Sequence, residues 1–509
     1  MKKEKAKNHN KKKIIIVGAG VAGLTAGIYA MQQGFETVIY EKHTQTGGLC
    51  TGWDRQGYHI DGCIHWVTGT KKGSALREIW DNVDALKDVE IIQQDYFDVY
   101  ECCGEKIYIW RDIEKLKNEF ITLAPADKKE IKRFIKDVKA VQKMIVPAES
   151  PVNLMTLPQL CKQLWSMRGT FSVLLRYKSM SVQKYSKRFS HPALRRVFEI
   201  CMPYNYSAAV FIFMVATFTL GNGDIPAGGS LQMANRMTKK FLSLGGIVKT
   251  GMLVTQINIT KNKATGIEYI TQAGEKCVDN ANYIISACDV HTTFNVLLKN
   301  SYHDSAFVKR FHQPKIYETQ SCVLLTFAVE ADLTNYPYSL VLECEKYRVG
   351  VTDYEKITVR NYVYEPSFAP QGHTVINVLI SQGDNDYLFW KSLYFNKAIY
   401  KAEKQRLADV IKKRIEERFP ELVGKIKLLD ALSPMTFQRY CSSYNGAWMA
   451  FRIGKGTRNL MHTGKIKGLS NCYLTGQWLQ PPGGLPVALT MGKFTIQRIC
   501  KKEGMNFRF

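Results

Sequence analysis

The sequence has 509 residues, which is too long for one hydrophobic core and predicts two or three domains. Its composition, 45% hydrophobic and 23% charged, excludes a fibrous or largely disordered chain. Seventy Lys and Arg against 45 Asp and Glu give a formal net charge of +25, which favours anionic partners but says nothing about the fold.

The N-terminal residues raise the question of a signal peptide. The first thirteen residues carry seven Lys and one Glu, which predicts a solvated basic arm, and an apolar run with small residues follows. We reject a leader because a nucleotide-binding strand and turn explain this run better. No run reaches the roughly 18 apolar residues of a membrane-spanning helix. The 13 Cys include no C-x-x-C pair, which predicts reduced thiols in a cytosolic protein.

The strongest motif follows the basic arm. Its parts are an apolar strand over 14–17, the pattern G-x-G-x-x-G at Gly18, Gly20 and Gly23, a helix over 21–33, a strand over 37–40, and Glu41. The first glycine permits a tight turn, the second lets the backbone approach a pyrophosphate, and the third lets the helix pack on the strand. Because all parts occur in register, they predict a dinucleotide-binding unit with Glu41 on a ribose hydroxyl.

A glycine pair, Gly47-Gly48, and a predicted hairpin come next. The sequence WDRQGYHIDG predicts two strands that turn at Gln56-Gly57. The stretch DGCIHWVTG (61–69) is no metal site, because Cys63 and His65 have no further ligand pair nearby. An ordinary imidazole pKa would suit His65 as a proton donor, whereas a His in an apolar strand is commonly structural, so both roles stay open.

Residues 150–223 contain a single acid, Glu199, and nine basic residues interleaved with apolar ones. Basic and apolar residues on one helical segment suit the surface of an anionic bilayer, so we expect 162–196 to contact a membrane. A solvated basic face beside a buried helix is the alternative. The nearly uncharged run 200–223 is interpreted as the wall of an apolar substrate cavity. Nucleic acid is disfavoured because no nucleic-acid module is recognisable.

The rest of the chain predicts a mixture of strands and helices. Segment 110–219 reads mostly helical; strands are expected near 252–259, 264–271, 283–287, 321–329, 373–381 and 472–475, an amphipathic helix over 395–419, and a helix from about Leu485. The N-terminus of that last helix follows a Pro/Gly turn and carries a partial positive charge.

Four separated blocks resemble the FAD-dependent phytoene desaturase, carotenoid isomerase and retinol saturase-like family of the flavin amine oxidase superfamily. They are the glycine motif with its Gly47-Gly48 extension, IPAGGS to ACDV (225–290), LLDALSPMTFQRYCSSYNGAWMAF (428–451) and NCYLTGQWLQPPGGLPVALTMG (471–492). The resemblance implies an α/β fold, with a Rossmann-type, GR2-like FAD-binding domain and an inserted α+β substrate domain. The FAD domain is expected over 1–95, 221–295 and 465–509. The substrate domain is expected over 96–220 and 296–464, with a helical, membrane-facing cap.

The resemblance also implies the residues of the site. It assigns FAD contacts to Gly18, Gly20, Val21, Ala22, Gly23, Glu41, Lys42, Gly47, Gly48, Leu49, Val254, Ala287, Gly476, Gln477, Gly484, Leu485, Pro486 and Ala488. The substrate face and the catalytic candidates are His65, Tyr440 and Trp478, and no metal is expected.

The sequence therefore predicts an FAD-dependent oxidoreductase, a phytoene dehydrogenase-like enzyme. Its substrate is expected to be long and apolar: a carotenoid, a retinoid or an unsaturated acyl chain. Desaturation, saturation and double-bond isomerisation stay open, because all use the same cofactor placement. The alternatives are a flavin amine oxidase and a non-catalytic, flavin-binding, membrane-associated redox protein. The location is expected to be cytoplasmic, either free or peripheral at the inner face of the membrane.

Overall fold

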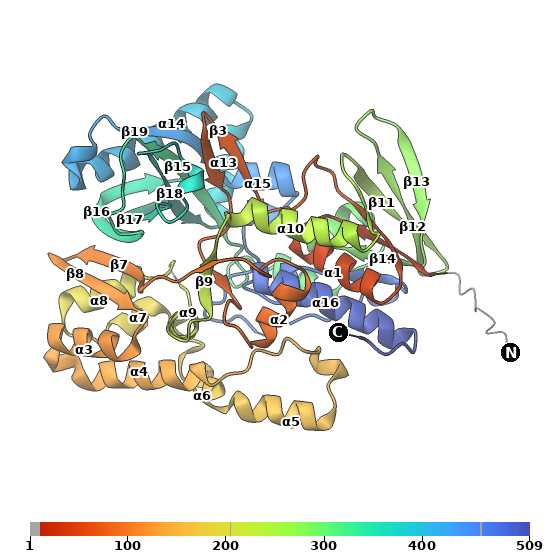
Figure 1. The fold of residues 1–509 in the computed structure, drawn as a ribbon, viewed down its shortest axis with the longest axis horizontal. Coiled ribbons are helices and arrows are strands. Elements are labelled where there is room, and N and C mark those ends of the chain that lie inside the picture. Colours follow the sequence, from red (N-terminus) through yellow and green to blue (C-terminus); the bar gives the residue numbers. More distant parts are fainter. Residues whose placement is uncertain (1–10, 204, 459–460, 509) are drawn as a thin grey trace.

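The computed structural model describes residues 11–203, 205–458 and 461–508, so most of the predicted basic arm lies outside the described residues. Figure 1 shows a parallel sheet with long helices near both chain ends, a second sheet beside it, and a group of helices below that second sheet. The predicted α/β class, with a Rossmann-like domain, is confirmed.

The first sheet is parallel throughout, in the order β10-β2-β1-β14-β20. Its strands are β1 (Lys13–Val17), β2 (Glu36–Tyr40), β10 (Ile247–Lys249), β14 (Tyr283–Ser286) and β20 (Cys472–Leu474). The order joins strands that are hundreds of residues apart. The pairing of β1 with β14 and of β14 with β20 therefore builds this sheet from distant segments of the chain.

The apolar run of β1 is continuous because both faces of the sheet are covered. Ile14 and Ile16 pack into one hydrophobic cluster with the helices, whereas Ile15 and Val17 pack into another with an antiparallel sheet. The helices are α1 (Val21–Gln32), α10 (Gly229–Ser243) and α16 (Leu485–Lys502). The antiparallel strands are β11 (Leu253–Thr260), β12 (Lys263–Ile270) and β13 (Lys276–Asn280).

The predicted hairpin forms β3 (Gly52–Arg55) and β4 (Tyr58–Asp61), and Gln56 and Gly57 both have positive φ at its turn. A small sheet follows the hairpin along the chain. It consists of β5 (Val67–Thr68), β6 (Ile91–Ile92) and β9 (Gly223–Pro226), and α2 (Ala75–Asn82) lies between its first two strands in sequence.

The second sheet has seven strands in the order β19-β15-β18-β17-β16-β7-β8. The strands are β7 (Tyr96–Cys102), β8 (Glu105–Trp110), β15 (Ser321–Val329), β16 (Ser339–Val349), β17 (Thr352–Asn361), β18 (Thr374–Gln382) and β19 (Ile426–Leu432). One face packs on α13 (Asp384–Tyr394) and α14 (Lys397–Arg418). The opposite face of β18 contacts the β4 strand of the first domain.

The helical segment between β8 and β9 is as predicted. It contains α3 (Ile113–Leu123), α4 (Lys128–Gln142), α5 (Leu157–Ser166), α6 (Arg168–Tyr177), α7 (Val182–Ser186), α8 (Pro192–Ile200) and α9 (Ala208–Thr219). Buried aromatic rings hold these helices together, with Phe134, Phe198 and Phe211 in mutual contact. Helix α5 differs from the others because none of its residues is buried, and it lies at the lower edge of Figure 1.

The chain between α4 and α5 is fastened to the outer side of α16. Lys493 Nζ donates to the carbonyl of Ala148 at 3.2 Å, and Gln497 Nε2 donates to the carbonyl of Glu149 at 2.8 Å. Arg498 Nη2 reaches Asn153 Oδ1 at 3.3 Å. These side chains of α16 are buried, so residues 148–153 complete the surface of the first domain.

Three short helices contact the first domain or the second sheet. They are α11 (Val290–Thr292), α12 (Ser305–Phe311) and α15 (Pro434–Cys441). Phe307 of α12 packs into the cluster beneath the parallel sheet, as do Ala450 and Phe451. These residues, which we expected to belong to the substrate domain, therefore share a core with the first domain. Within the described ranges, no helix is long and apolar enough to cross a membrane.

Candidate dinucleotide and substrate site

The turn between β1 and α1 has the geometry that its glycines predict. Gly18 has φ +103°, and its N–H donates to the carbonyl of Tyr40 at 2.8 Å. A Cβ on Gly23 would overlap the carbonyl of Gly18, so only glycine allows α1 to start this close to the strand.

The N-terminus of α1 has the features of an anion-binding helix end. In the described chain, no side chain caps it; the first turn has no acid, and Val21, Ala22 and Gly23 are buried. Free N–H groups at a buried helix end normally require a partner, and a phosphate supplies one. Gly47 donates to the carbonyl of Ala19 at 2.9 Å, which brings the second glycine pair beside this end. A Cβ on Gly20 would come 3.8 Å from the carbonyl oxygen of Gly47, so the two glycine turns line one space.

Glu41 closes the other side of the glycine turn. The buried carboxylate accepts from the N–H of Ala19 at 2.7 Å and from the N–H of His43 at 3.0 Å. Val254 lies buried on the neighbouring β11, and Ala287 follows β14, where its N–H donates to Val17 at 2.9 Å. The residues predicted at the adenosine end thus come from the ends of β2 and β14, which flank β1 in the parallel sheet, and from β11 of the antiparallel sheet.

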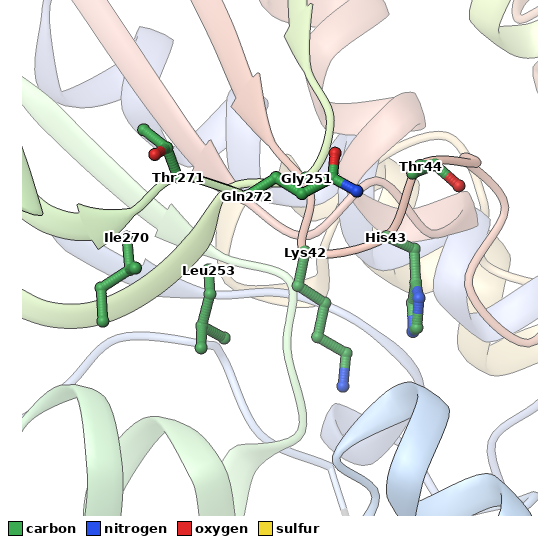
Figure 2. A pocket seen from close by; sticks show the side chains of 8 residues that line it. All are labelled: Lys42, His43, Thr44, Gly251, Leu253, Ile270, Thr271 and Gln272. Carbon is green, nitrogen blue, oxygen red and sulfur yellow. The ribbon is translucent and has the colours of Figure 1, made fainter. Parts of the chain in front are cut away.

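An open cavity of about 360 Å³ borders this end. Figure 2 shows Lys42 and His43 on one side, and Leu253 with Ile270 on the other. Lys42 Nζ donates to Ser442 Oγ at 2.8 Å, and burial lowers the pKa of its ammonium. Lys42 therefore ties the predicted cofactor loop to the end of α15.

The start of α16 is a second uncapped helix end. Gly484 precedes it with φ +87°, its first turn has no acid, and no side-chain cap is found among the described residues. The N–H of Gly484 donates to Gln477 Oε1 at 2.9 Å, and Gln477 Nε2 reaches the carbonyl of Trp448 at 3.4 Å. Helix α16 crosses α1 at Gly492, where a Cβ would lie 2.8 Å from the Cβ of Thr25. Its N-terminus lies roughly 10 Å earlier along the helix, at 1.5 Å per residue.

Asp61 organises the segment that carries His65. Its carboxylate accepts from the N–H groups of Cys63 and Ile64, both at 2.9 Å, and from the N–H and hydroxyl of Ser230, both at 2.6 Å. Asp61 is buried, and burial raises the pKa of its carboxyl even though these donors oppose the shift. The residue therefore joins the hairpin to the N-terminus of α10.

His65 lies beside Trp448 at the end of this segment. The ring centroids are 6.1 Å apart in an edge-on arrangement, and His65 Nδ1 is buried without a hydrogen-bond partner among the described residues. Burial, with a smaller effect from Arg360, lowers the pKa of His65 to about 3. At neutral pH the imidazole is therefore uncharged. A low pKa disfavours the proton-donor role, which was one of the two roles that the sequence left open, whereas a neutral ring can still hydrogen-bond to a substrate.

The other two catalytic candidates lie elsewhere. Tyr440 is half-exposed on α15, where its ring is tilted against the ring of His43, with the two centroids 5.2 Å apart. Trp478 is buried against Phe451, with ring centroids 5.0 Å apart. The tight turn over 477–479 directs Gln477 toward α16 and Trp478 into the core, which the sequence does not reveal. The structure therefore does not bring Tyr440 and Trp478 to the ring of His65.

Trp448 and Asn377 are the residues that the sequence analysis missed. Trp448 contacts both His65 and, through Gln477, the start of α16. Asn377 is fully buried on β18, donates to the carbonyl of Asp61 at 3.2 Å, and leaves its Oδ1 without a partner in the described structure. A Trp after Gly446, which has φ +62°, was a visible signal, whereas Asn377 sits in an apolar strand with none.

The low pKa of His65 has a consequence for stability. The imidazole has a pKa near 6.5 when unfolded and about 3 when folded, so between these values the unfolded chain binds more protons. The contribution of the neutral His65 to stability is therefore fully present above about pH 6.5 and is lost as the pH falls from there toward 3. We expect His65→Gln to reduce the loss of unfolding free energy between pH 7.5 and 5 by about 2 kcal/mol. Urea unfolding at both pH values measures this difference in unfolding free energy. His312 is exposed, so His312→Gln should show the same difference as the wild type. If His65→Gln also shows the wild-type difference, the low pKa of His65 is contradicted.

Within the part of the chain that the structure describes, no group of three or more His, Cys, Asp or Glu side chains is arranged to hold a metal ion.

Together, the parallel sheet, the glycine turn and the two uncapped helix ends are the features of a Rossmann-type dinucleotide-binding domain. Residues 16–83 match the family of NAD(P)-binding Rossmann-like domains. The chain is 24% identical to a 1-hydroxycarotenoid 3,4-desaturase of Flavobacterium sp. (strain P99-3), covering 96% of this chain and 99% of that protein. It is 23% identical to human all-trans-retinol 13,14-reductase, covering 91% and 82%. Cyclohexylamine oxidase of Brevibacterium oxydans shares the fold at a TM-score of 0.56 and 13% identity, covering 97% of this chain and 100% of that one.

These similarities support the resemblance of the chain to oxidoreductases of the phytoene desaturase and retinol saturase-like family.

Proposed function

We propose that this protein is an FAD-dependent oxidoreductase that acts on a carbon–carbon bond of a long apolar substrate, such as a carotenoid, a retinoid or an unsaturated acyl chain. The observation that carries the proposal is the pair of helix N-termini, α1 and α16, each of which starts after a glycine and has no side-chain cap among the described residues. The near full-length similarity to a carotenoid desaturase and a retinol reductase supports the substrate class.

The residues present fit FAD. Gly18, Gly20 and the first turn of α1 would hold the pyrophosphate, with Gly47 and Gly48 on its other side, and Val21, Ala22, Gly23 and Leu49 would complete that wall. Glu41 would exchange its bonds to Ala19 and His43 for ribose hydroxyls, beside Val254, Ala287 and Lys42. Gly476, Gln477, Gly484, Leu485, Pro486 and Ala488 would face the flavin ring, where a helix N-terminus stabilises negative charge. When bound, the flavin would accept or donate hydride.

His65 and Trp448 would form the substrate face. The aromatic ring of Trp448 offers a flat apolar surface, and Leu49, Leu324 and Leu379 pack in the same hydrophobic cluster. The neutral His65 would hydrogen-bond to a polar group of the substrate or to water, and its low pKa would prevent it from carrying charge into an apolar cavity. Tyr440 and Trp478 would act indirectly, since Tyr440 lies near the adenosine end and Trp478 supports the loop of Gln477.

The two alternatives have less support. A flavin amine oxidase shares the fold, but a likeness of 13% identity carries the fold alone. A non-catalytic redox protein would not require the apolar cluster beside His65.

The proposal is tested with the protein reconstituted with FAD. The flavin is reduced anaerobically in one sample and left oxidised in another, and liposomes that contain phytoene, all-trans-retinol or an unsaturated fatty acid are added to both. We expect one lipid class either to reoxidise the reduced flavin or to reduce the oxidised flavin, and to show a changed mass or isomer composition by chromatography. If no lipid changes the redox state of either sample or its own mass or isomer composition, the substrate class is overturned. Reoxidation by an amine-derived imine alone would support the amine oxidase.

We further propose that α5 and α6 contact an anionic membrane. The exposed apolar side chains of this surface are Leu157, Leu164, Trp165, Phe171, Leu174 and Leu175. Trp165 is 69% and Leu175 is 70% exposed, and the guanidinium of Arg168 lies 3.7 Å from the Trp165 ring. An apolar helix face with exposed Lys162 and Arg168 suits the interface of an acidic bilayer.

Three basic residues of the predicted membrane segment have other partners, and one of them, Arg196, pairs with Glu343 and Glu355 of the second sheet. Arg176 binds Asp137 at 2.6 Å, and Arg188 binds Glu130 at 3.0 Å. Their charges are therefore compensated within the cap, and the predicted contact narrows from 162–196 to the face of α5 and α6.

Replacing the apolar anchors should abolish vesicle binding. We expect the double variant Trp165→Glu/Leu175→Glu to lose most of its sedimentation with phosphatidylglycerol–phosphatidylcholine vesicles, because two charges would replace apolar side chains that the bilayer would bury. Phe395→Glu is the control, since Phe395 is 83% exposed on the α13–α14 connection. Equal sedimentation of the wild type and the double variant would contradict the membrane surface.

A further inference from the structure

Cys50 and Cys63 occupy opposite positions on two segments that run antiparallel. In the β3–β4 hairpin, Gly52 pairs with Asp61, and the N–H of Gly62 donates to the carbonyl of Thr51 at 2.9 Å. One step further along the same register, Cys50 faces Cys63. Residues directly opposite in such a ladder have Cβ atoms roughly 4.5–5.5 Å apart, close to the roughly 3.5–4.5 Å of a disulfide.

The two thiols influence each other. The neighbouring Cys50 thiol, together with burial, raises the pKa of the Cys63 thiol well above its usual value. Cys50 is 1% exposed and directs its sulfur toward the carbonyl of Ser230 at 3.4 Å. Cys63 is only half-buried, so the pair can be reached from the side of Cys63.

The backbone around the pair is held firmly. Asp61 bonds the N–H of Cys63, and Cys50 donates its own N–H to the carbonyl of Gly47 at 3.1 Å. Cys50 follows the Gly47-Gly48 turn of the proposed pyrophosphate site, and Cys63 precedes His65 by two residues. A bond between the sulfurs would join the two loops that border the proposed cofactor path.

We propose that Cys50 and Cys63 are a two-electron redox site, in which the pair of thiols is reversibly oxidised to a disulfide. Two S–H bonds break and one S–S bond forms, so the pair releases two electrons and two protons. The acceptor is a two-electron oxidant: either a small soluble disulfide, which leaves as two thiols, or the oxidised flavin of the proposed function. With the flavin, the electrons and one proton pass to the acceptor and the second proton passes to solvent. Only this second arm rests on the proposed function.

The test maps the disulfide by mass spectrometry in two arms. The apoprotein is equilibrated with reduced and oxidised glutathione at a series of ratios, then denatured, alkylated and digested. The FAD-reconstituted protein is held anaerobically without another oxidant, and its visible absorbance is followed before alkylation. We expect a cross-linked peptide of Cys50 and Cys63, lighter by two hydrogens than the reduced pair, that forms and disappears reversibly in the glutathione series.

The controls separate this pair from the other thiols. Cys50→Ala and Cys63→Ala should each abolish the cross-link and leave one additional alkylated cysteine, whereas Cys102→Ala should leave it unchanged. Bleaching of the flavin in step with the cross-link identifies the flavin as acceptor; a cross-link in the glutathione arm alone identifies a soluble disulfide. Separate alkylation of Cys50 and Cys63 at every ratio, or pairing of Cys63 with the neighbouring Cys322, overturns the proposal. Failure of FAD to bind would overturn the proposed function but leave the glutathione arm readable.

Discussion

Gly20→Val is expected to yield a folded protein that binds FAD about 100-fold more weakly than the wild type. A Cβ at this position points between the two glycine turns, 3.8 Å from Gly47 and 4.0 Å from Gly48, so the apoprotein tolerates it. A valine would nevertheless fill the space of the pyrophosphate and block the N–H groups of α1. Losing roughly 3 kcal/mol of charge-assisted hydrogen bonding corresponds to about 100-fold weaker binding. Flavin fluorescence quenching measures the dissociation constant, and circular dichroism reports the fold.

The other glycines supply the contrast. Gly274→Ala changes an exposed turn with open space around it and should bind FAD normally. Gly23→Ala should instead unfold the domain, because its Cβ would overlap the carbonyl of Gly18. A yellow Gly20→Val protein with one flavin per chain would refute the placement of the pyrophosphate.

Asp61→Ala is expected to lower the free energy of unfolding by about 3–5 kcal/mol, because several buried donors lose their acceptor at once. The groups that lose their acceptor are the N–H groups of Cys63 and Ser230 and the hydroxyl of Ser230, whereas the N–H of Ile64 keeps Ser230 Oγ as a second acceptor at 2.8 Å. Chemical denaturation of the apoprotein measures the loss without involving a cofactor.

Asp54→Ala is the matched control on the same hairpin. Its carboxylate is 80% exposed and contacts only His59 among the ion pairs of the described residues, so the change should stay within about 0.5 kcal/mol. If Asp61→Ala proves as stable as Asp54→Ala, then Asp61 does not hold the hairpin to α10.

The sequence predicted those parts of the molecule whose physics is local. Strand β1, the glycine turn and α1 lie where their pattern placed them, because a tight turn, a buried strand and a helix start depend on neighbouring residues. The hairpin at Gln56-Gly57 and the helix from Leu485 follow from the same kind of signal. The resemblance to a known family supplied the pairing of distant segments, which periodicity alone cannot provide.

What the sequence could not show depends on contacts between distant residues. The pKa of His65 follows from burial by other segments, so the sequence could not decide between its two possible roles. Arg176 and Arg188 looked available for lipid because their partners, Asp137 and Glu130, lie on another helix. Tyr440 was chosen from a matching block, whereas Trp448, eight residues later, faces His65 because of the turn at Gly446.

The hydrogen bonds between residues 148–153 and α16 make the helical segment between β8 and β9 inseparable from the first domain. Removing residues 148–153 would expose the buried side chains of Lys493, Gln497 and Arg498 and would remove the carbonyl and amide groups to which they donate. A shortened chain without this helical segment would therefore lack part of the domain's own outer wall. Melting of the intact chain should accordingly remove both regions in one cooperative step.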